Sequence, residues 1–151
     1  MYLYRREYLS NYSFINDDNE KQKFAAIVDA VGIQPTKHSP HIHVEVCVAY
    51  WRKANAVHKW FCDLDGGRDE CQNIYVTREN LVTLRDLCAS VISQPAMAAS
   101  VLPTQAGFFF GSYDYDEWYM RDMEDTINQI EKILESVPEG GWTDFIYRAS
   151  W

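Results

Sequence analysis

The stretch HIHVEVCVAYWRKANAVHKWFCD (His41–Asp63) decides the fold, because its side-chain periodicity changes partway along. At positions 41–48, aliphatic residues alternate with His, Glu and Cys, which is the pattern of a half-buried β-strand. From about position 49 the apolar residues instead recur at helical spacing. The helical stripe consists of Tyr50, Ala54, Val57 and Phe61. We therefore expect a strand at 41–48 followed directly by a helix at about 49–63.

Further strands and helices are predicted on both sides of this stretch. They are strands at 2–9, 74–76 and 142–151, and helices at 20–31, from Thr77 to about Ser93, and at 115–137 with a cap formed by Asp114 and Glu117. Arg5 and Arg6 favour an edge position for the first strand. The sequence thus predicts an α+β fold, in which three to four helices pack on a small, mainly antiparallel sheet. We expect a single globular domain over 1–151.

The chain has 151 residues, of which 47% are hydrophobic, so it can bury a proper core. Its formal net charge of −8 opposes general binding to nucleic acid, which needs Lys and Arg facing phosphates. No stretch approaches the ~20 apolar residues of a membrane span, and the N-terminus lacks the apolar core of a secretory signal. The four cysteines form no CxxC pair. We expect them to be reduced, mostly buried thiols in a cytoplasmic protein.

Polar and aromatic side chains are mixed within the predicted helix at 49–63. Trp51, Asn55 and His58 are three or four positions apart, so they would share one helix face. An indole face, an amide edge and an imidazole can together recognise a planar ligand. The same side chains could instead be structural, with the amide and imidazole bonded to backbone and the indole in the core.

A second aromatic stretch, GFFFGSYDYDEWY (Gly107–Tyr119), carries acidic residues, whereas the first, YWRKANAVHKWF (Tyr50–Phe61), carries basic ones. Three adjacent phenylalanines cannot all point to one side of a strand, so one should face a pocket or partner, although a buried strand also explains them. Asp116 is a candidate partner for Arg52 or Lys53. We expect the two stretches to lie side by side and form a binding site. Its expected residues are Trp51, Lys53, Asn55, His58, Trp60, Phe109, Tyr113 and Asp116.

The polar face of the strand at 41–48 presents His41, His43 and Glu45 in line, and all three are potential zinc or iron ligands. These residues span about 13 Å of extended strand, so at most two can share one ion. A further ligand, such as His58, would have to come from another element. The alternative is a polar strand face turned to solvent.

An enzyme is a second hypothesis. His58 with Glu45 or Asp116 would form the acid–base pair of a small hydrolase or nuclease, and a metal at His41 and His43 would be its metal-dependent form. The chain contains no GxxxxGK[ST], GxGxxG or GxSxG motif. No particular reaction is therefore indicated.

The two aromatic stretches also resemble known proteins. YWRKANAVHKWF (50–61) and LPTQAGFFFGSYDYDEWY (102–119) are similar to the YWRKANxxHxWF and LPTxxGFFFG blocks of a family of small uncharacterised bacteriophage and prophage proteins. His41 and His43 are not part of that pattern, which weakens the metal hypothesis. The resemblance brings no established activity, but it implies a viral origin, an intracellular setting and a role against the host.

These observations favour a phage-encoded binding protein of the host cytoplasm. It would antagonise a host defence system by binding a host protein or a nucleotide-like molecule. We expect no cofactor and no membrane contact, and a homo-oligomer is compatible with the sequence. A structural or assembly factor without a pocket is a third hypothesis.

Overall fold

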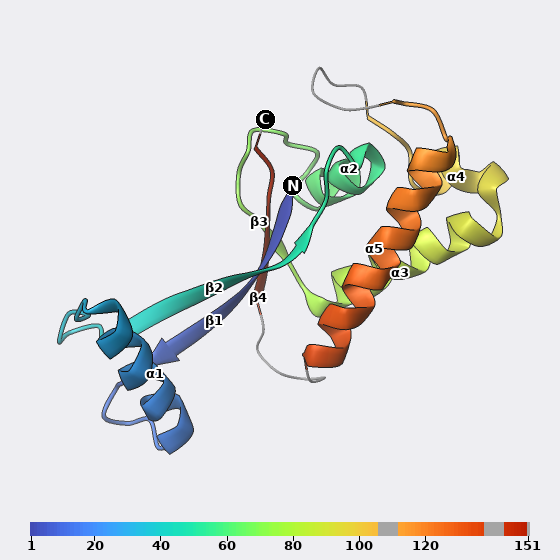
Figure 1. The fold of residues 1–151 in the computed structure, drawn as a ribbon. Helices are drawn as coiled ribbons and strands as arrows, with labels where there is room; N and C mark the ends of the chain where they lie inside the picture. Colours follow the sequence, from blue (N-terminus) through green and yellow to red (C-terminus); the bar gives the residue numbers. More distant parts are fainter. Residues whose placement is uncertain (106–111, 138–143, 151) are drawn as a thin grey trace. The chain divides into compact units, whose positions relative to one another are not determined.

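The structure, a computed structural model, describes residues 1–105, 112–137 and 144–150, and its α+β fold confirms the predicted class (Figure 1). The elements are β1 (Tyr2–Ser10), α1 (Asp18–Val31), β2 (His41–Tyr50), α2 (Asn55–Leu64), β3 (Ile74–Val76), α3 (Arg78–Ser93), the 3-10 helix η1 (Pro95–Met97), α4 (Ala98–Val101), α5 (Glu117–Ser136) and β4 (Asp144–Arg148). Within the described residues there are thus five α-helices, of which α4 is a single turn.

The four strands form one antiparallel sheet in the order β2-β1-β4-β3. The predicted edge position of β1 is therefore wrong, because β1 lies between β2 and β4. Its arginines do not mark an edge, since Arg6 binds Glu45 of the neighbouring strand (2.6 Å). A charged side chain inside a sheet is tolerated where a neighbouring strand supplies the opposite charge.

The chain divides into two compact units, Arg6–Val46 and a larger unit made of Met1–Arg5 with Cys47–Trp151. The single domain that the sequence suggests stays a prediction. In the smaller unit, Phe24 and Val28 of α1 pack with Leu9, Ile42 and Val44. Helix α1 begins after Asp17, whose carboxylate accepts from two backbone N–H groups, and ends at Gly32 with a φ of 72°.

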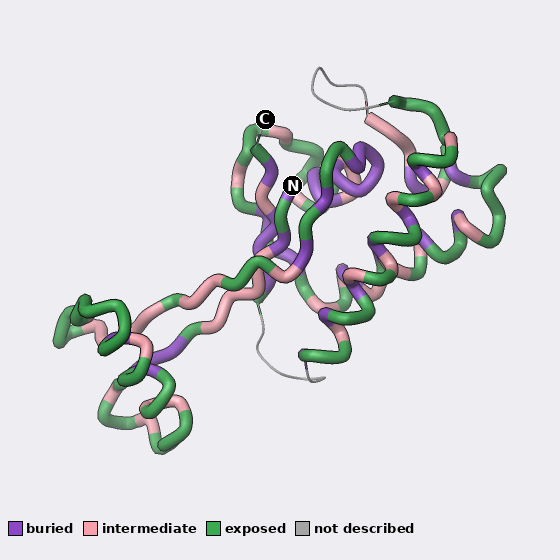
Figure 2. The backbone as a smooth tube through the Cα atoms, viewed as in Figure 1, coloured by how far each residue is buried: buried purple, intermediate pink, exposed green. Residues whose placement is uncertain are grey.

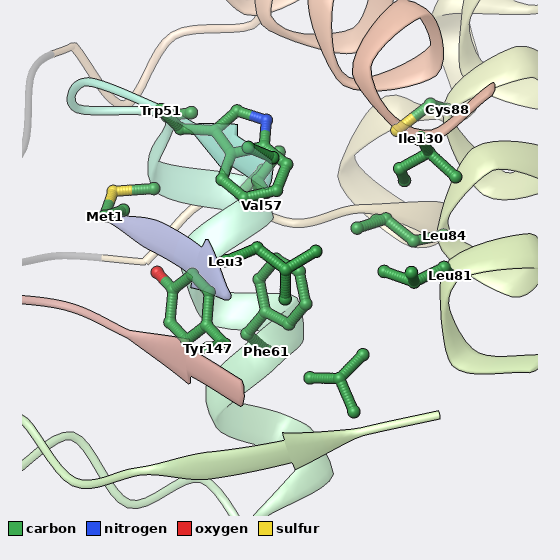
Figure 3. Packing of buried hydrophobic residues seen from close by; sticks show 14 of the residues in the cluster. Met1, Leu3, Trp51, Val57, Phe61, Leu81, Leu84, Cys88, Ile130 and Tyr147 are labelled. Carbon is green, nitrogen blue, oxygen red and sulfur yellow. The ribbon is translucent and has the colours of Figure 1, made fainter. Parts of the chain in front are cut away.

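The larger unit has an aromatic core. The rings of Phe61 and Tyr147 stack with centroids 4.1 Å apart, and Leu3 and Trp51 pack close to them (Figure 3). Helices α3 and α5 lie side by side (Figure 1), and their facing sides carry buried residues (Figure 2). The predicted inward residues of α3 are all buried: Leu81, Leu84, Cys88 and Val91.

The helix predicted at 49–63 begins later, at Asn55. Strand β2 continues to Tyr50, where the amide of Gln129 binds both backbone groups of Tyr50 (2.8 and 3.1 Å). Lys53 then has a φ of 62°, which no α-helix contains. The predicted helical face is therefore wrong in its first member, because Trp51 precedes the helix.

The start of α5 also differs from the prediction. Asp116, rather than Asp114, is the N-cap, and its carboxylate accepts from the backbone N–H groups of Trp118 and Tyr119 (both 3.0 Å). Asp114 instead belongs to a local turn in which its backbone N–H donates to Ser112 Oγ (3.0 Å). Two nearby acids both fit a cap pattern, and only the backbone conformation selects between them.

All four cysteines are free, and the expectation of mostly buried thiols holds for Cys62 and Cys88 but is wrong for Cys47 and Cys71, which are exposed. Across the described residues, no helix combines the length and the apolar character that crossing a membrane requires.

Candidate functional site

The larger unit contains a cleft of about 400 Å³ between the chain around the start of α2 and the start of α5. Its charged and aromatic lining includes Arg52, Lys53, Asp114, Asp116, Trp118 and Asp122. Basic side chains from the first aromatic stretch therefore line the same cleft as acidic side chains from the second stretch. Asp122, one helical turn after Trp118 on α5, adds a further carboxyl group.

Arg52 and Lys53 form the basic side of the cleft, and both are exposed. Among the residues that the structure describes, neither forms a salt bridge, so their charges are available to a ligand. Lys53 is held in the left-handed region, which costs a non-glycine residue about 1–2 kcal/mol. Backbone strain of this kind is found preferentially at ligand-binding positions.

Asp122 and Asp116 form the acidic side. Burial, together with the nearby carboxylates of Asp125 and Asp116, raises the pKa of the Asp122 carboxyl to about 6, and burial is the largest cause. Asp122 is therefore partly protonated just below neutral pH, when it can donate as well as accept a hydrogen bond.

Asn55 lines the cleft but is largely committed to the protein. Its side chain is buried, its Nδ2 donates to the backbone carbonyl of Gln105 (2.8 Å), and its Oδ1 accepts from the N–H of the same residue. This two-bond pairing ties the start of α2 to the segment after α4. Of the two hypotheses for Asn55, the structural one accounts for these bonds.

His58 lies in the core with 1% of its surface exposed. Its Nδ1 is 2.7 Å from Tyr147 Oη, and its Nε2 is 3.1 Å from Asp69 Oδ1 and 3.4 Å from Cys62 Sγ. Burial lowers the pKa of His58, although Asp69 acts against this shift. Gln105 Nε2 donates to the other oxygen of Asp69 (3.1 Å), which extends the network.

The two tryptophans of the first stretch are structural. Trp51 is buried and its indole N–H donates to Thr126 Oγ1 (2.9 Å). Trp60 is partly buried and meets Phe61 edge to face, with centroids 5.2 Å apart. Neither indole lines the cleft, so the exposed aromatic surface there comes from Trp118.

The remaining two expected binding residues, Phe109 and Tyr113, lie in the second stretch. Tyr113 is 47% exposed, and its backbone carbonyl accepts from Thr104 Oγ1 (3.1 Å). Phe109 lies outside the described residues. The GFFFG segment therefore contributes no described side chain to the cleft.

The predicted metal ligands lie in the smaller unit. His41 stacks on Tyr8, with centroids 5.3 Å apart, and its Nδ1 bonds Ser39 Oγ (2.8 Å). Glu45 binds Arg6. The carboxylate bonded to His58 is that of Asp69, whereas the predicted acid–base pair uses Glu45 or Asp116.

Several residues of the cleft and the network carried no sequence signal. Asp69 is in a glycine-containing turn, and Gln105 and Tyr147 are far from His58 along the chain. Trp118 and Asp122 are different, because their four-residue spacing on a predicted helix places both on one helix face. That spacing could have identified them.

Comparisons with protein-family models, curated proteins and solved structures found no match to this chain.

Proposed function

We propose that this protein is a phage-encoded binding protein of the host cytoplasm whose cleft takes up a small nucleotide-like molecule. The observation that carries the proposal is that two basic side chains and an indole line the same cleft. Arg52 and Lys53, which form no salt bridge in the described part of the chain, line the same cleft as the 68% exposed Trp118. Arginine and lysine side chains bind phosphate, and a nucleobase can stack on an indole ring.

The size of the cleft supports a small ligand. Its volume of about 400 Å³ falls within the range of about 300–1,000 Å³ that is usual for small-molecule sites. The guanidinium of Arg121 lies over the Trp118 ring, 4.9 Å from its centroid, and steadies the indole by a cation–π contact. Trp118 is nevertheless exposed and lines the cleft, so its ring can stack on a nucleobase.

The acidic side of the cleft favours a ligand that carries hydrogen-bond donors in addition to an anionic group. Asp116 and Asp122 would repel phosphate but can accept hydrogen bonds from an amino group, such as that of adenine or guanine. The raised pKa of Asp122 also reduces the negative charge near the phosphates. A nucleotide presents both chemistries, whereas inorganic phosphate presents one.

The phage origin and the role against the host rest on the sequence resemblance. Removal of a nucleotide-like signal from the host cytoplasm would weaken a defence system that depends on it. The hydrolase or nuclease alternative has less support, because its base, His58, is 1% exposed and does not line the cleft.

The experiment is a thermal-shift screen of the purified protein with adenosine and guanosine mono-, di- and triphosphates and with cyclic dinucleotides. A ligand that binds only the folded state raises the Tm, and the rise grows with the logarithm of the ligand concentration once this exceeds the Kd. We expect at least one of these compounds to raise the Tm of the wild type but not that of Trp118→Ala. A host protein recovered on the cleft in place of a nucleotide would overturn the small-ligand proposal.

A further inference from the structure

Three side chains of α2 and the turn after it bring potential metal ligands together. The ligand atoms of His58, Cys62 and Asp69 all lie within 4.8 Å of one another. His58 and Cys62 are one helical turn apart on α2, so their side chains share one face. Asp69 comes from the chain that follows the helix and meets them there.

The two distances from His58 Nε2 to the other ligand atoms are close to those around a tetrahedral zinc ion. Zinc bonds of about 2.3 Å to sulfur and about 2.0–2.1 Å to nitrogen or oxygen place neighbouring N and S about 3.5 Å apart, and N and O about 3.3 Å apart. In this protein the Nε2–Sγ distance is 3.4 Å and the Nε2–Oδ1 distance is 3.1 Å. An ion could therefore enter with small movements of the three side chains.

Nε2 of the imidazole faces both the carboxylate oxygen of Asp69 and the sulfur of Cys62. In the metal-free protein the Nε2 proton can go to the carboxylate, while the thiol keeps a proton of its own. A metal ion would be shared by all three atoms.

We propose that His58, Cys62 and Asp69 bind one zinc ion, with the fourth tetrahedral position left to a water molecule. Three protein ligands and an open position are the pattern of a zinc site that can exchange its fourth ligand. The cluster does not line the charged cleft, so the proposal stands independently of the proposed function.

The outer contacts of the cluster are those that a zinc site needs. Zinc on Nε2 requires the proton on Nδ1, and Tyr147 Oη, 2.7 Å away, can accept it. Gln105 Nε2 donates to the second oxygen of Asp69 and orients that carboxylate. These partners fix the imidazole and the carboxylate before the ion arrives.

The chemistry of the ligands selects zinc, and the structure leaves it a way in. A thiolate with an imidazole favours zinc over magnesium or calcium, which prefer oxygen ligands. Asp69 has a side-chain exposure of 25%, so an ion can reach the cluster from its side, although His58 and Cys62 are buried.

The test uses protein purified without an affinity tag. After zinc loading and dialysis, we expect about one zinc per chain by elemental analysis, as one tetrahedral site holds one ion. Cobalt should replace it and give a thiolate-to-cobalt charge-transfer band together with the visible bands of tetrahedral cobalt. Magnesium and calcium should not compete. A folded wild type that retains no zinc and shows no cobalt–thiolate band overturns the proposal.

The variants separate this site from other thiols. Cys62→Ala and Asp69→Asn should each abolish the cobalt–thiolate band or weaken zinc binding at least tenfold, and Tyr147→Phe should weaken it by about tenfold. Cys88→Ala, a buried thiol, and Cys47→Ser, an exposed one, are the controls and should bind as the wild type does. Asp69→Asn removes a partly exposed group, so it tests the site even if Cys62→Ala fails to fold. Loss of binding in either control and not in Asp69→Asn overturns the assignment.

Discussion

The side-chain amide of Asn55 pairs with both backbone groups of Gln105, although the two residues are 50 positions apart. The pair ties the start of α2 to the segment after α4. It therefore joins two of the regions that line the charged cleft, since Asn55 and Thr104 both lie on its wall.

Asn55→Ala should lower the free energy of unfolding by about 2 kcal/mol, because it leaves two backbone groups of Gln105 without their partner. Urea unfolding followed by circular dichroism measures this loss. Asn128→Ala is the matched control, since Asn128 is exposed on α5, and it should be neutral or slightly stabilising. Equal stability of Asn55→Ala and the control would show that the pairing is dispensable.

Lys53→Gly should raise stability and lower ligand binding at the same time. Glycine adopts the φ of 62° without strain, so we expect a gain of about 1 kcal/mol after the entropy of the unfolded chain is counted. The lost ammonium should weaken nucleotide binding.

The control for Lys53→Gly is Cys71→Gly, at the other described non-glycine residue with a positive φ (55°). It should share the gain in stability and leave binding unchanged. If Lys53→Gly is no more stable than the wild type, the backbone strain at Lys53 is contradicted. If its nucleotide binding is unchanged, Lys53 is not part of the site.

Asp122→Asn should be more stable than the wild type above about pH 6 and nearly equal to it at about pH 4. The folded protein raises the pKa of Asp122 to about 6, chiefly by burial. A raised carboxyl pKa means that the folded state holds its proton more tightly than the unfolded state does. The wild type therefore loses stability as the pH rises through this range, and the amide, which does not titrate, avoids that loss.

The measurement is the Tm of both proteins between about pH 4 and about pH 8, where the difference should grow up to about pH 6 and then level off. Asp86→Asn makes the same carboxylate-to-amide change at an exposed residue of α3 that does not line the cleft, and it is the control for the substitution itself. A difference that shrinks with rising pH would contradict the placement of Asp122 in a desolvated site.

The sequence predicted best those elements whose own residues determine them. Helix α3 has a side-chain cap at Thr77 and an apolar stripe, so its start and its buried face were both correct. Helix α2 was predicted six residues too early, because Gln129, from a distant part of the chain, holds Tyr50 in the strand. No local pattern contains that information.

The same division applies to the candidate site. The two aromatic stretches were expected to contribute to one site, and residues from both line the cleft. The roles of single residues were less predictable. Trp51 was expected to bind a ligand because it lies among polar residues, but its indole N–H is bonded to Thr126 in the core. The carboxylate partner of His58 comes from a turn, and only the tertiary fold brings the two together.

The most direct test of the central claim is isothermal titration calorimetry of the best nucleotide from the screen with the wild type, Arg52→Ala and Arg85→Ala. Arg52 lines the cleft, whereas Arg85 is paired with Asp86 on α3. Loss of one charge-assisted hydrogen bond should weaken binding by about tenfold or more in Arg52→Ala and leave Arg85→Ala unchanged. Equal affinities of the wild type and Arg52→Ala, or no binding of any nucleotide by the folded wild type, would contradict the claim that this cleft holds a nucleotide-like ligand.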